Sequence, residues 1–327
     1  MIMGSTKAKL LKLLEGSRKS YISGGALAKE LAVSRNAVWK AVQSLRSDGY
    51  GISAVTNKGY RLEVCGDTLT EAGIIGNLRN AGVFRIEVRK SVTSTNTVLL
   101  EMAAKAAPEG YVIAAESQTA GKGRMGRTFH SPAGHGVYFS LLLRPRSKVK
   151  EASLITAAAA VAAARAIEHV TGVGVGIKWV NDLFVDGKKV CGILTEAAFD
   201  MESGYIESAV LGIGINVTMP QEGYPEDIGS VATAVTDRNS GKEGERCRLI
   251  AAVLDNFWEF YQNLSAREFL SEYRSRSIIL GRDIHVLTRG GIRRVHALAL
   301  NDECELVVRR EDGGTETLSS GEVSIIT

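Results

Sequence analysis

Two short helical patterns separated by a tight turn, and then a hairpin, constrain the first sixty residues of the chain. Residues 26–31 have the apolar spacing of a short helix. Ser34 follows as a natural N-cap, because its hydroxyl can accept from the free backbone N–H groups of the next helix. That helix repeats apolar residues on one face from Val38 to Leu45, and residues 52–64 then read as two strands joined by a turn. The pattern predicts a winged helix-turn-helix domain.

The same segment is basic. Residues 1–65 carry 11 Lys and Arg against 4 Asp and Glu, a net charge of +7, whereas the remainder carries 29 against 32, a net charge of −3. A basic segment on a near-neutral body indicates an anionic partner. The alternative is a small helical packing domain with incidental charge, but the spacing and the basic excess together favour DNA binding. The predicted DNA contacts are Ser34, Arg35, Asn36, Trp39, Lys40 and Gln43 on the second helix and Lys58 at the tip of the wing.

The length of 327 residues exceeds one typical domain of about 100–200 residues. Strands and helices alternate irregularly in the middle of the chain, which indicates an α+β domain with a mixed sheet. After residue 276 only short strands and turns remain, which predicts a small barrel. We therefore expect a winged helix-turn-helix at 1–66, a linker at 67–84, an α+β catalytic domain at 85–275 and a small β domain at 276–327.

Several classes of protein are excluded. No apolar stretch reaches the roughly 18 residues that a membrane span needs, and residues 154–164 are mostly alanine, as in a soluble helix. The N-terminus lacks the pattern of a signal peptide. The four cysteines, at positions 65, 191, 247 and 304, are too scattered for a disulfide framework or a metal site. We expect a cytoplasmic protein with no dedicated metal site.

Residues 118–127 form a glycine-rich basic segment that satisfies G-x-G-x-x-G. A dinucleotide-binding fold would need a helix after this segment, and a strand follows instead, so that interpretation is rejected. Lys122, Arg124 and Arg127 suggest a loop that closes over phosphates or carboxylates. The alternative is a flexible, solvated basic loop, and composition alone leaves both open.

Three further segments carry polar or small residues in strands. The sequence Lys-Trp-Val-Asn-Asp at 178–182 is typical of a ligand site at a strand end, or of a hairpin with a buried tryptophan. Lys188 and Lys189 enter an apolar strand, and for Lys188 an exposed hairpin edge is favoured. The alternating glycines of 212–216 permit close approach of a ligand, or only curvature of the strand.

In this order the motifs resemble the bifunctional biotin–protein ligase and biotin-operon repressor family. The resemblance covers nearly the whole chain and implies an SH3-like barrel at the C-terminus. The sequence departs from the family at Lys122 and Met125, where arginine is frequent, and at Val180, where proline is common. The matching motifs are Ser94-Thr95-Asn96, Gly121–Arg127, Lys178-Trp179-x-Asn181-Asp182, Lys189-x-x-Gly192-Ile193-Leu194 and Gly212-x-Gly214-x-Asn216.

The resemblance implies a two-step reaction. Biotin's carboxylate attacks the α-phosphate of ATP to give biotinyl-5′-AMP, and a lysine of a biotin carboxyl carrier protein then takes the biotinyl group. The substrate supplies the nucleophile of the first step, so the main barrier is electrostatic. At ~4 Å and an effective dielectric constant of ~20, two like charges repel by about 4 kcal/mol. Preplaced cations and Mg²⁺ bound with the nucleotide would offset that repulsion.

Roles follow by matching position within the family's motifs. Arg124 and Lys189 are expected to stabilise the developing negative charge and are the predicted catalytic residues. The predicted biotin contacts are Ser94, Thr95, Asn96, Gln118, Lys122, Gly123, Arg124 and Lys189, and the predicted ATP or adenylate contacts are Gly121, Arg127, Lys178, Asn181 and Asn216.

Two other functions remain open at this point. One is a transcription regulator that senses a ligand without catalysis, although the ligase cations are all present. The other is a ligase for a different small acid such as lipoate. The winged domain and the C-terminal barrel favour biotin over this alternative. If the family's activities are both present, biotinyl-5′-AMP would order the loop and favour a homodimer that aligns two winged domains on operator DNA of biotin synthesis genes.

Overall fold

The computed structural model describes residues 6–17, 20–47, 50–62, 67–145, 152–199, 202, 204–236, 244–288 and 291–326. The chain forms two compact units, one of residues 1–68 with 242–244 and the other of residues 69–241 with 245–327. The predicted α+β class is confirmed, with a helix-turn-helix at the N-terminus, a central mixed sheet and a C-terminal antiparallel sheet.

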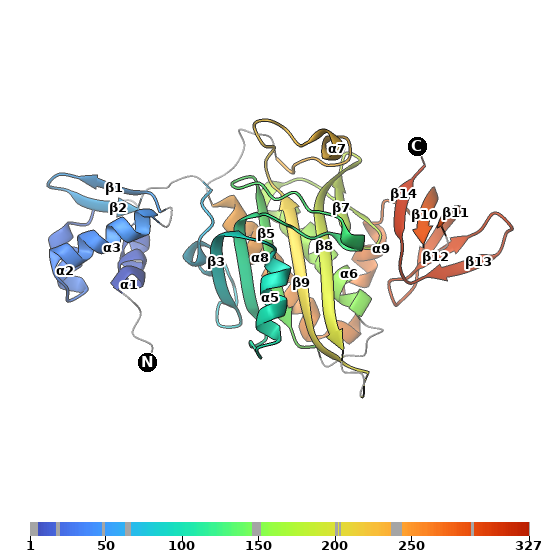
Figure 1. The fold of residues 1–327 in the computed structure, drawn as a ribbon, viewed down its shortest axis with the longest axis horizontal. Helices are drawn as coiled ribbons and strands as arrows, with labels where there is room; N and C mark the ends of the chain where they lie inside the picture. Colours follow the sequence, from blue (N-terminus) through green and yellow to red (C-terminus); the bar gives the residue numbers. More distant parts are fainter. Residues whose placement is uncertain are drawn as a thin grey trace. The chain divides into compact units, whose positions relative to one another are not determined.

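The first unit contains three helices and a hairpin. Ser23 and Ser34 cap the second and third helices, each accepting at 3.1 Å from the backbone N–H three residues on. Residues 63 and 64, the predicted end of the hairpin, lie outside the described residues. The elements are α1 (Thr6–Gly16), α2 (Gly24–Glu30), α3 (Arg35–Ser47), β1 (Ile52–Val55) and β2 (Gly59–Leu62) (Figure 1). Their core is formed by Leu10, Leu14, Leu27, Val38, Val42, Leu45, Ile52 and Leu62.

Backbone contacts hold the wing against the helices. Tyr60 and Ile22 exchange two N–H···O bonds of 2.8 Å each. The approach needs Gly59, whose φ is +107° and whose Cβ, if present, would lie 2.1 Å from the Ile22 carbonyl oxygen. Arg46 donates from Nε and Nη2 to the Ile52 carbonyl at 2.9 and 2.5 Å. Arg46 therefore anchors the wing to α3.

The second unit is built on a seven-stranded sheet in the order β3-β4-β5-β9-β8-β7-β6. Strands β3 and β4 are parallel and the other neighbours are antiparallel, so the predicted mixed sheet is confirmed. The strands are β3 (Arg85–Val92), β4 (Tyr111–Gln118), β5 (Gly136–Leu143), β6 (Gly176–Lys178), β7 (Asp182–Val185), β8 (Lys188–Phe199) and β9 (Ile206–Asn216).

Helices cover both faces of this sheet. Helix α5 (Thr95–Ala103) packs on β4, β5 and β9, and α6 (Ala152–Thr171) with α8 (Glu245–Gln262) covers the opposite face (Figure 1). The alanines of α6 are buried, and their small side chains let the helix fit between the sheet and α8. Helix α6 is long and apolar enough to cross a membrane, but 67% of its most apolar window is buried, which is typical of a core helix.

Of the linker that the sequence predicts at 67–84, residues 69–84 belong to the second unit. They contain α4 (Glu71–Ile75), which contacts β3 and α8, and Leu69, Ile74 and Phe84 are buried. The remaining short elements are η1 (Arg124–Gly126), α7 (Glu226–Gly229), η3 (Leu264–Ala266) and α9 (Leu270–Ser275).

The predicted run of short C-terminal strands forms a five-stranded antiparallel sheet in the order β13-β12-β11-β10-β14. Its buried side chains join the same hydrophobic core as α6 and α8. The strands are β10 (Asp283–Thr288), β11 (Gly291–Leu300), β12 (Leu306–Arg309), β13 (Thr315–Leu318) and β14 (Glu322–Ile325).

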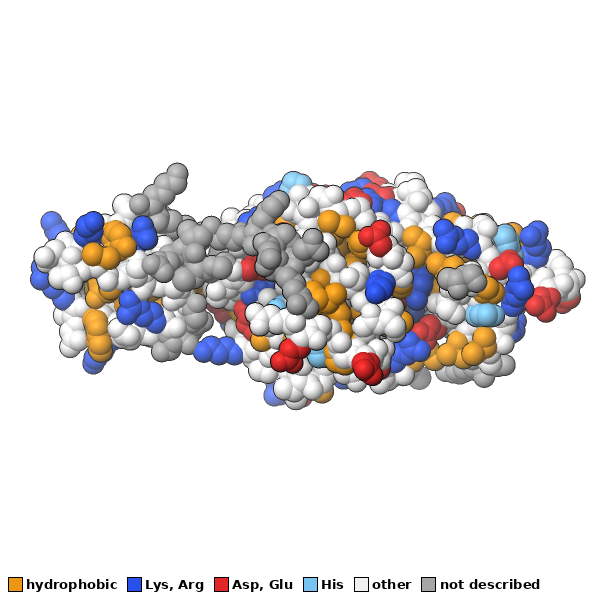
Figure 2. Space-filling view, turned by 90° about the horizontal axis from the view of Figure 1, so that it is seen from above, with side chains coloured by type: hydrophobic (Ala, Val, Ile, Leu, Met, Phe, Trp, Pro, Cys, Tyr) orange, Lys and Arg blue, Asp and Glu red, His pale blue; other side chains and the backbone are white. Residues whose placement is uncertain are grey.

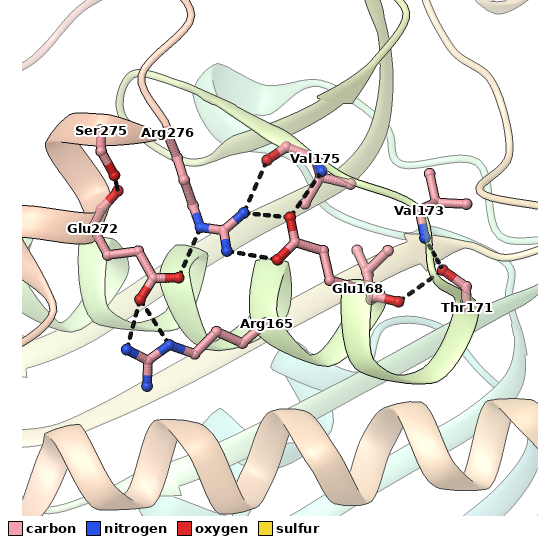
Figure 3. Close-up of polar contacts among 9 residues, drawn as sticks. Arg165, Glu168, Thr171, Val173, Val175, Glu272, Ser275 and Arg276 are labelled. Carbon is pink, nitrogen blue, oxygen red and sulfur yellow. Dashed lines mark hydrogen bonds and ion pairs between the residues drawn. The ribbon is translucent and has the colours of Figure 1, made fainter.

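An ion-pair network ties α6 to α9 next to β6 (Figure 3). Arg276 holds Glu168 with two contacts of 2.5 and 2.6 Å and Glu272 with one of 2.8 Å. Arg165 binds the other oxygen of Glu272 at 2.6 Å.

The hydrogen bonds from Arg276 lower the pKa of Glu168 below its ordinary value of 4.5, although burial alone would raise it. Burial raises the pKa of Glu272, but its two arginines lower it more.

We predict that Arg276→Ala lowers the free energy of unfolding by about 2 kcal/mol at pH 7, because partly buried carboxylates lose a charged donor. The lowered carboxyl pKa values mean that this stabilisation is present above pH 4.5 and is lost as the pH falls through the folded-state values. Urea denaturation at pH 7 and pH 3.5 measures the difference between wild type and variant, which should narrow at the lower pH. Arg294→Ala, at an exposed pair with Asp283, is the control and should lower the free energy of unfolding much less than Arg276→Ala. A pH-independent difference would contradict the prediction.

Candidate functional site

A pocket opens between the glycine-rich segment, the start of α5 and strands β8 and β9. It brings together residues from six separate parts of the sequence, among them nine of the predicted site residues. The lining is formed by Ser94, Thr95, Asn96, Gln118, Lys122, Gly123, Arg124, Phe129, Asn181, Lys189, Gly192, Ile193, Leu194, Gly212, Ile213 and Gly214.

One end of the pocket is neutral and polar. Thr95 and Asn96 occupy the first turn of α5 and are buried, together with Ser94. Gln118, at the end of β4, accepts from the Thr95 backbone N–H at 2.9 Å and donates from Nε2 to Ser131 Oγ, also at 2.9 Å. These bonds hold the side-chain amide in one orientation. This end can therefore recognise a ligand that offers several hydrogen-bonding groups.

Two polar residues beneath this end were not predicted from the sequence. Ser140 of β5 is fully buried, and its Oγ lies 2.6 Å from Asn96 Oδ1 and 2.7 Å from Thr95 Oγ1. Glu196 of β8 lies 2.8 Å from Asn96 Nδ2. The available signal for Ser140 is its place as the one polar side chain among the apolar residues 137–143. Together the two residues fix the side chain of Asn96.

Glycines in β9 make room for these side chains. A Cβ at Gly212 would lie 2.1 Å from Asn96 Oδ1, and one at Gly214 would lie 2.5 Å from the ring of Phe129. The alternating glycines therefore permit close approach of the Asn96 and Phe129 side chains. Close approach of a ligand, which the sequence predicts, stays a prediction.

The other end of the pocket is cationic. Lys189 Nζ lies 2.7 Å from Asp182 Oδ1, and Arg124 Nη1 donates to Asn181 Oδ1 at 3.0 Å. Lys122 Nζ lies 3.7 Å from Glu196 Oε1. Each cation is held by a neighbouring side chain while it still faces the pocket. This end is suited to bind a carboxylate or a phosphate.

Lys178 and Arg127 lie beside the cationic end but do not line the pocket. Burial lowers the pKa of Lys178, and Lys189 and Arg127 lower it further, whereas Asp182 and Glu322 raise it. Arg127 forms an ion pair with Glu322 of β14. The C-terminal sheet thus supplies a counter-charge to the glycine-rich segment.

Gly121 and Asn216 also lie outside the pocket lining. The carbonyl of Gly121 accepts from the Phe129 N–H at 2.8 Å, which helps to fold the glycine-rich segment back on itself. Asn216, at the end of β9, donates to the Thr233 carbonyl at 3.1 Å. Within the described ranges no group of three His, Cys, Asp or Glu residues is placed to hold a metal ion.

The Lys-Trp-Val-Asn-Asp segment is fixed from both sides. Trp179 donates from Nε1 to the Cys304 carbonyl at 2.9 Å, so the C-terminal sheet holds this segment in place. Asn181 donates from Nδ2 to the Ile193 carbonyl at 2.8 Å, and its backbone carbonyl accepts from the Ile193 N–H at 3.0 Å. The tryptophan is buried, as the hairpin interpretation predicts, and Asn181 lines the pocket, so the ligand-site interpretation stays a prediction.

The predicted DNA contacts lie on the exposed side of α3 and at the wing. Trp39 is 51% exposed although it is large and aromatic, and Gln43 is half-buried. Figure 2 shows Lys and Arg side chains together with apolar ones on the face of the first unit that is turned to the viewer. The remaining predicted contacts, Ser34, Arg35, Asn36, Lys40 and Lys58, are exposed.

Comparison with known proteins identifies each part of the chain. The model of the biotin/lipoate A/B protein ligase family matches residues 88–216. A helix-turn-helix domain matches residues 6–61, and the biotin protein ligase C-terminal domain matches residues 279–325.

Whole-chain relatives show the same combination. The bifunctional ligase/repressor BirA of Bacillus spizizenii is 34% identical over 95% of this chain and 96% of its own length. The BirA of Escherichia coli is 26% identical over 97% and 96%. A biotin protein ligase from Aquifex aeolicus, solved in complex with biotin and ATP, superimposes with a TM-score of 0.60 at 28% identity and covers 74% of this chain and 98% of its own. The chain belongs to the bifunctional ligase/repressor family of biotin protein ligases.

Proposed function

We propose that the protein is an ATP-dependent biotin–protein ligase, a biotin–[biotin carboxyl-carrier protein] ligase, that also represses biotin synthesis genes. The observation that carries the proposal is a pocket that has both a neutral polar end and a cationic end. Biotin has the same two ends, a neutral ureido ring and a carboxylate. The side chains of Ser94, Thr95, Asn96 and Gln118 would bind the ring, and those of Lys122, Arg124 and Lys189 would bind the carboxylate.

In the first step a carboxylate oxygen of biotin attacks the α-phosphorus of ATP, and pyrophosphate leaves. The cations must offset repulsion of about 4 kcal/mol for each close pair of like charges. Arg124 and Lys189 are already oriented by Asn181 and Asp182, so little reorganisation accompanies the reaction. Arg127, Lys178, Asn181, Asn216 and the backbone at Gly121 would serve the nucleotide, and Gly123 would lie along biotin.

In the second step the amine of an acceptor lysine attacks the biotinyl carbonyl carbon, AMP leaves and the amine loses a proton. The mixed anhydride hydrolyses in water, so the glycine-rich segment would close over it. Mg²⁺ would arrive with the nucleotide and neutralise phosphate charge, because the described residues offer no carboxylate cluster for it.

Four further features complete the proposal. The acceptor is a biotin carboxyl carrier protein, and the compartment is the cytoplasm. The C-terminal sheet belongs to an SH3-like barrel at 276–327. The other expected boundaries, 1–66 for the DNA-binding domain, 67–84 for the linker and 85–275 for the catalytic domain, are proposed as the functional division of the chain.

Arg124→Ala is expected to reduce biotin-dependent exchange of labelled pyrophosphate into ATP by about 100-fold or more, because it removes a preplaced cation from the developing charge. Lys188→Ala is the matched control, since Lys188 is exposed one position before Lys189, and it should exchange at nearly the wild-type rate. Exchange that persists in Arg124→Ala would contradict the assigned role. Biotin binding without exchange in the wild type would favour a ligand-sensing regulator.

DNA binding is expected to depend on salt in proportion to the phosphates contacted. Selection of bound sequences from random duplexes identifies a preferred site. Lys58→Ala should weaken binding to the preferred duplex and to an unrelated duplex by the same factor. It should also reduce the slope of log affinity against log salt concentration by about one. Asn36→Ala should instead reduce the difference in affinity between the two duplexes, because in the proposed complex the Asn36 side chain faces base edges. Lys12→Ala, which removes an exposed lysine of α1, is the control. A wild type with no preferred duplex would refute the repressor half of the proposal.

The adenylate is expected to strengthen homodimerisation by at least about tenfold, since a ligand shifts an equilibrium only by its preference for one state. Sedimentation equilibrium with biotinyl-5′-AMP, with AMP alone and without ligand measures the three dimerisation constants. Equal constants would remove the proposed link between the ligase site and operator binding.

A further inference from the structure

Four oxygen atoms beneath the polar end of the pocket share too few protons. They are Asn96 Oδ1, Ser140 Oγ, Thr95 Oγ1 and Gln118 Oε1, and the successive distances are 2.6, 2.7 and 3.2 Å. The two amide oxygens carry no proton and the two hydroxyls carry one each. Two protons therefore serve three contacts, and one contact must lack a proton.

Both ends of this row are fixed as acceptors. Asn96 Nδ2 faces the carboxylate of Glu196 at 2.8 Å and the Leu194 carbonyl at 3.4 Å, so the amide cannot turn its oxygen toward them. At the other end Gln118 Oε1 accepts from the Thr95 backbone N–H. The amide nitrogen of Gln118 is occupied by Ser131, whose hydroxyl lies 3.0 Å from the Phe129 carbonyl.

The proton positions follow from the distances. The two shortest contacts take the two protons, because leaving a buried contact of 2.6 or 2.7 Å between oxygens without one is the more costly choice. Ser140 then donates to Asn96, and Thr95 donates to Ser140. The remaining contact, between Thr95 Oγ1 and Gln118 Oε1, has no proton. Both of these residues line the pocket, so a ligand there would meet an acceptor pair, Thr95 Oγ1 and Gln118 Oε1.

We infer that Glu196 and Ser140 are positioning residues that select a ligand with an N–H group at this end of the pocket. Glu196 orients Asn96, Asn96 takes the proton of Ser140, and Ser140 takes the proton of Thr95. The acceptor pair of Thr95 and Gln118 is satisfied only by a donor from the ligand. This inference rests on the proposed function, in which the ureido ring supplies N–H groups, whereas the dithiolane ring of lipoate has none.

Two biotin analogues, each with one ureido N–H replaced by a ring oxygen, test the selection by calorimetry. The wild type should bind at least one of them about 100-fold more weakly than biotin, because its oxygen faces an acceptor. In Ser140→Ala the Thr95 hydroxyl can rotate and donate to the ring oxygen of the analogue. The ratio of the affinity for biotin to the affinity for the analogue should therefore fall to about tenfold or less. KM for biotin in pyrophosphate exchange should rise about tenfold while kcat stays within threefold.

Matched variants separate this role from a general loss of structure. Ser208→Ala removes another buried hydroxyl of the same sheet, on β9, and should leave the ratio unchanged. Glu196→Gln keeps an acceptor oxygen for Asn96 and should retain the wild-type ratio of affinities for biotin and the analogue. Glu196→Leu removes that oxygen and should lower the ratio. Both changes remove the partner of Lys122, so only their difference reports on Asn96.

The outcomes distinguish the two levels of the proposal. A wild type that binds neither biotin nor its analogues refutes the proposed function. A wild type that binds biotin, with a ratio unchanged in Ser140→Ala and Glu196→Leu, refutes the inference alone. If Ser140→Ala does not fold, the two Glu196 variants decide by the same ratio.

Discussion

Repulsion among the cations around the pocket is the constraint on which the rest of the site depends. Lys122, Arg124, Lys178 and Lys189 gather around the cationic end of the pocket, and neutral or acidic side chains hold them in place. Their partners come from β7, β8 and the segment between β6 and β7, so the sheet itself carries the counter-charges. An arriving carboxylate and triphosphate then meet cations whose orientation is already fixed, which is where electrostatic catalysis is most effective.

The C-terminal sheet contributes to this arrangement although none of its residues lines the pocket. The Cys304 carbonyl holds Trp179, and Glu322 pairs with Arg127 of the glycine-rich segment. Arg276, immediately before this sheet, binds Glu168 and Glu272 and accepts the Ile177 N–H of β6 at its carbonyl. The Lys-Trp-Val-Asn-Asp segment therefore depends on residues about one hundred positions later in the chain.

Much of the fold follows from local patterns in the sequence. The capped helices and wing of the first unit, the central strands and the C-terminal strands were all predicted from spacing and turns. The sequence does not reveal that α4 packs on β3 and α8 or that Phe84 is buried, because the ring of Phe84 packs on Trp258 of α8, far away in the chain. The family motifs supplied most of the pocket residues, but Ser140 and Glu196 act through Asn96 rather than on the pocket surface. Such positions become visible only when tertiary contacts are known.

The choice between biotin and lipoate illustrates what the match to the catalytic-domain model alone leaves open. The family model that matches residues 88–216 covers ligases for both acids, and both substrates carry a carboxylate that the cationic end would accept. The carboxylate therefore does not discriminate between them. Discrimination has to come from the neutral end, where a buried acceptor that stays unpaired weakens binding of a ligand without a donor. On this reasoning the substrate is selected by the direction of three hydrogen bonds, beginning at Glu196, and not by the shape of the pocket alone.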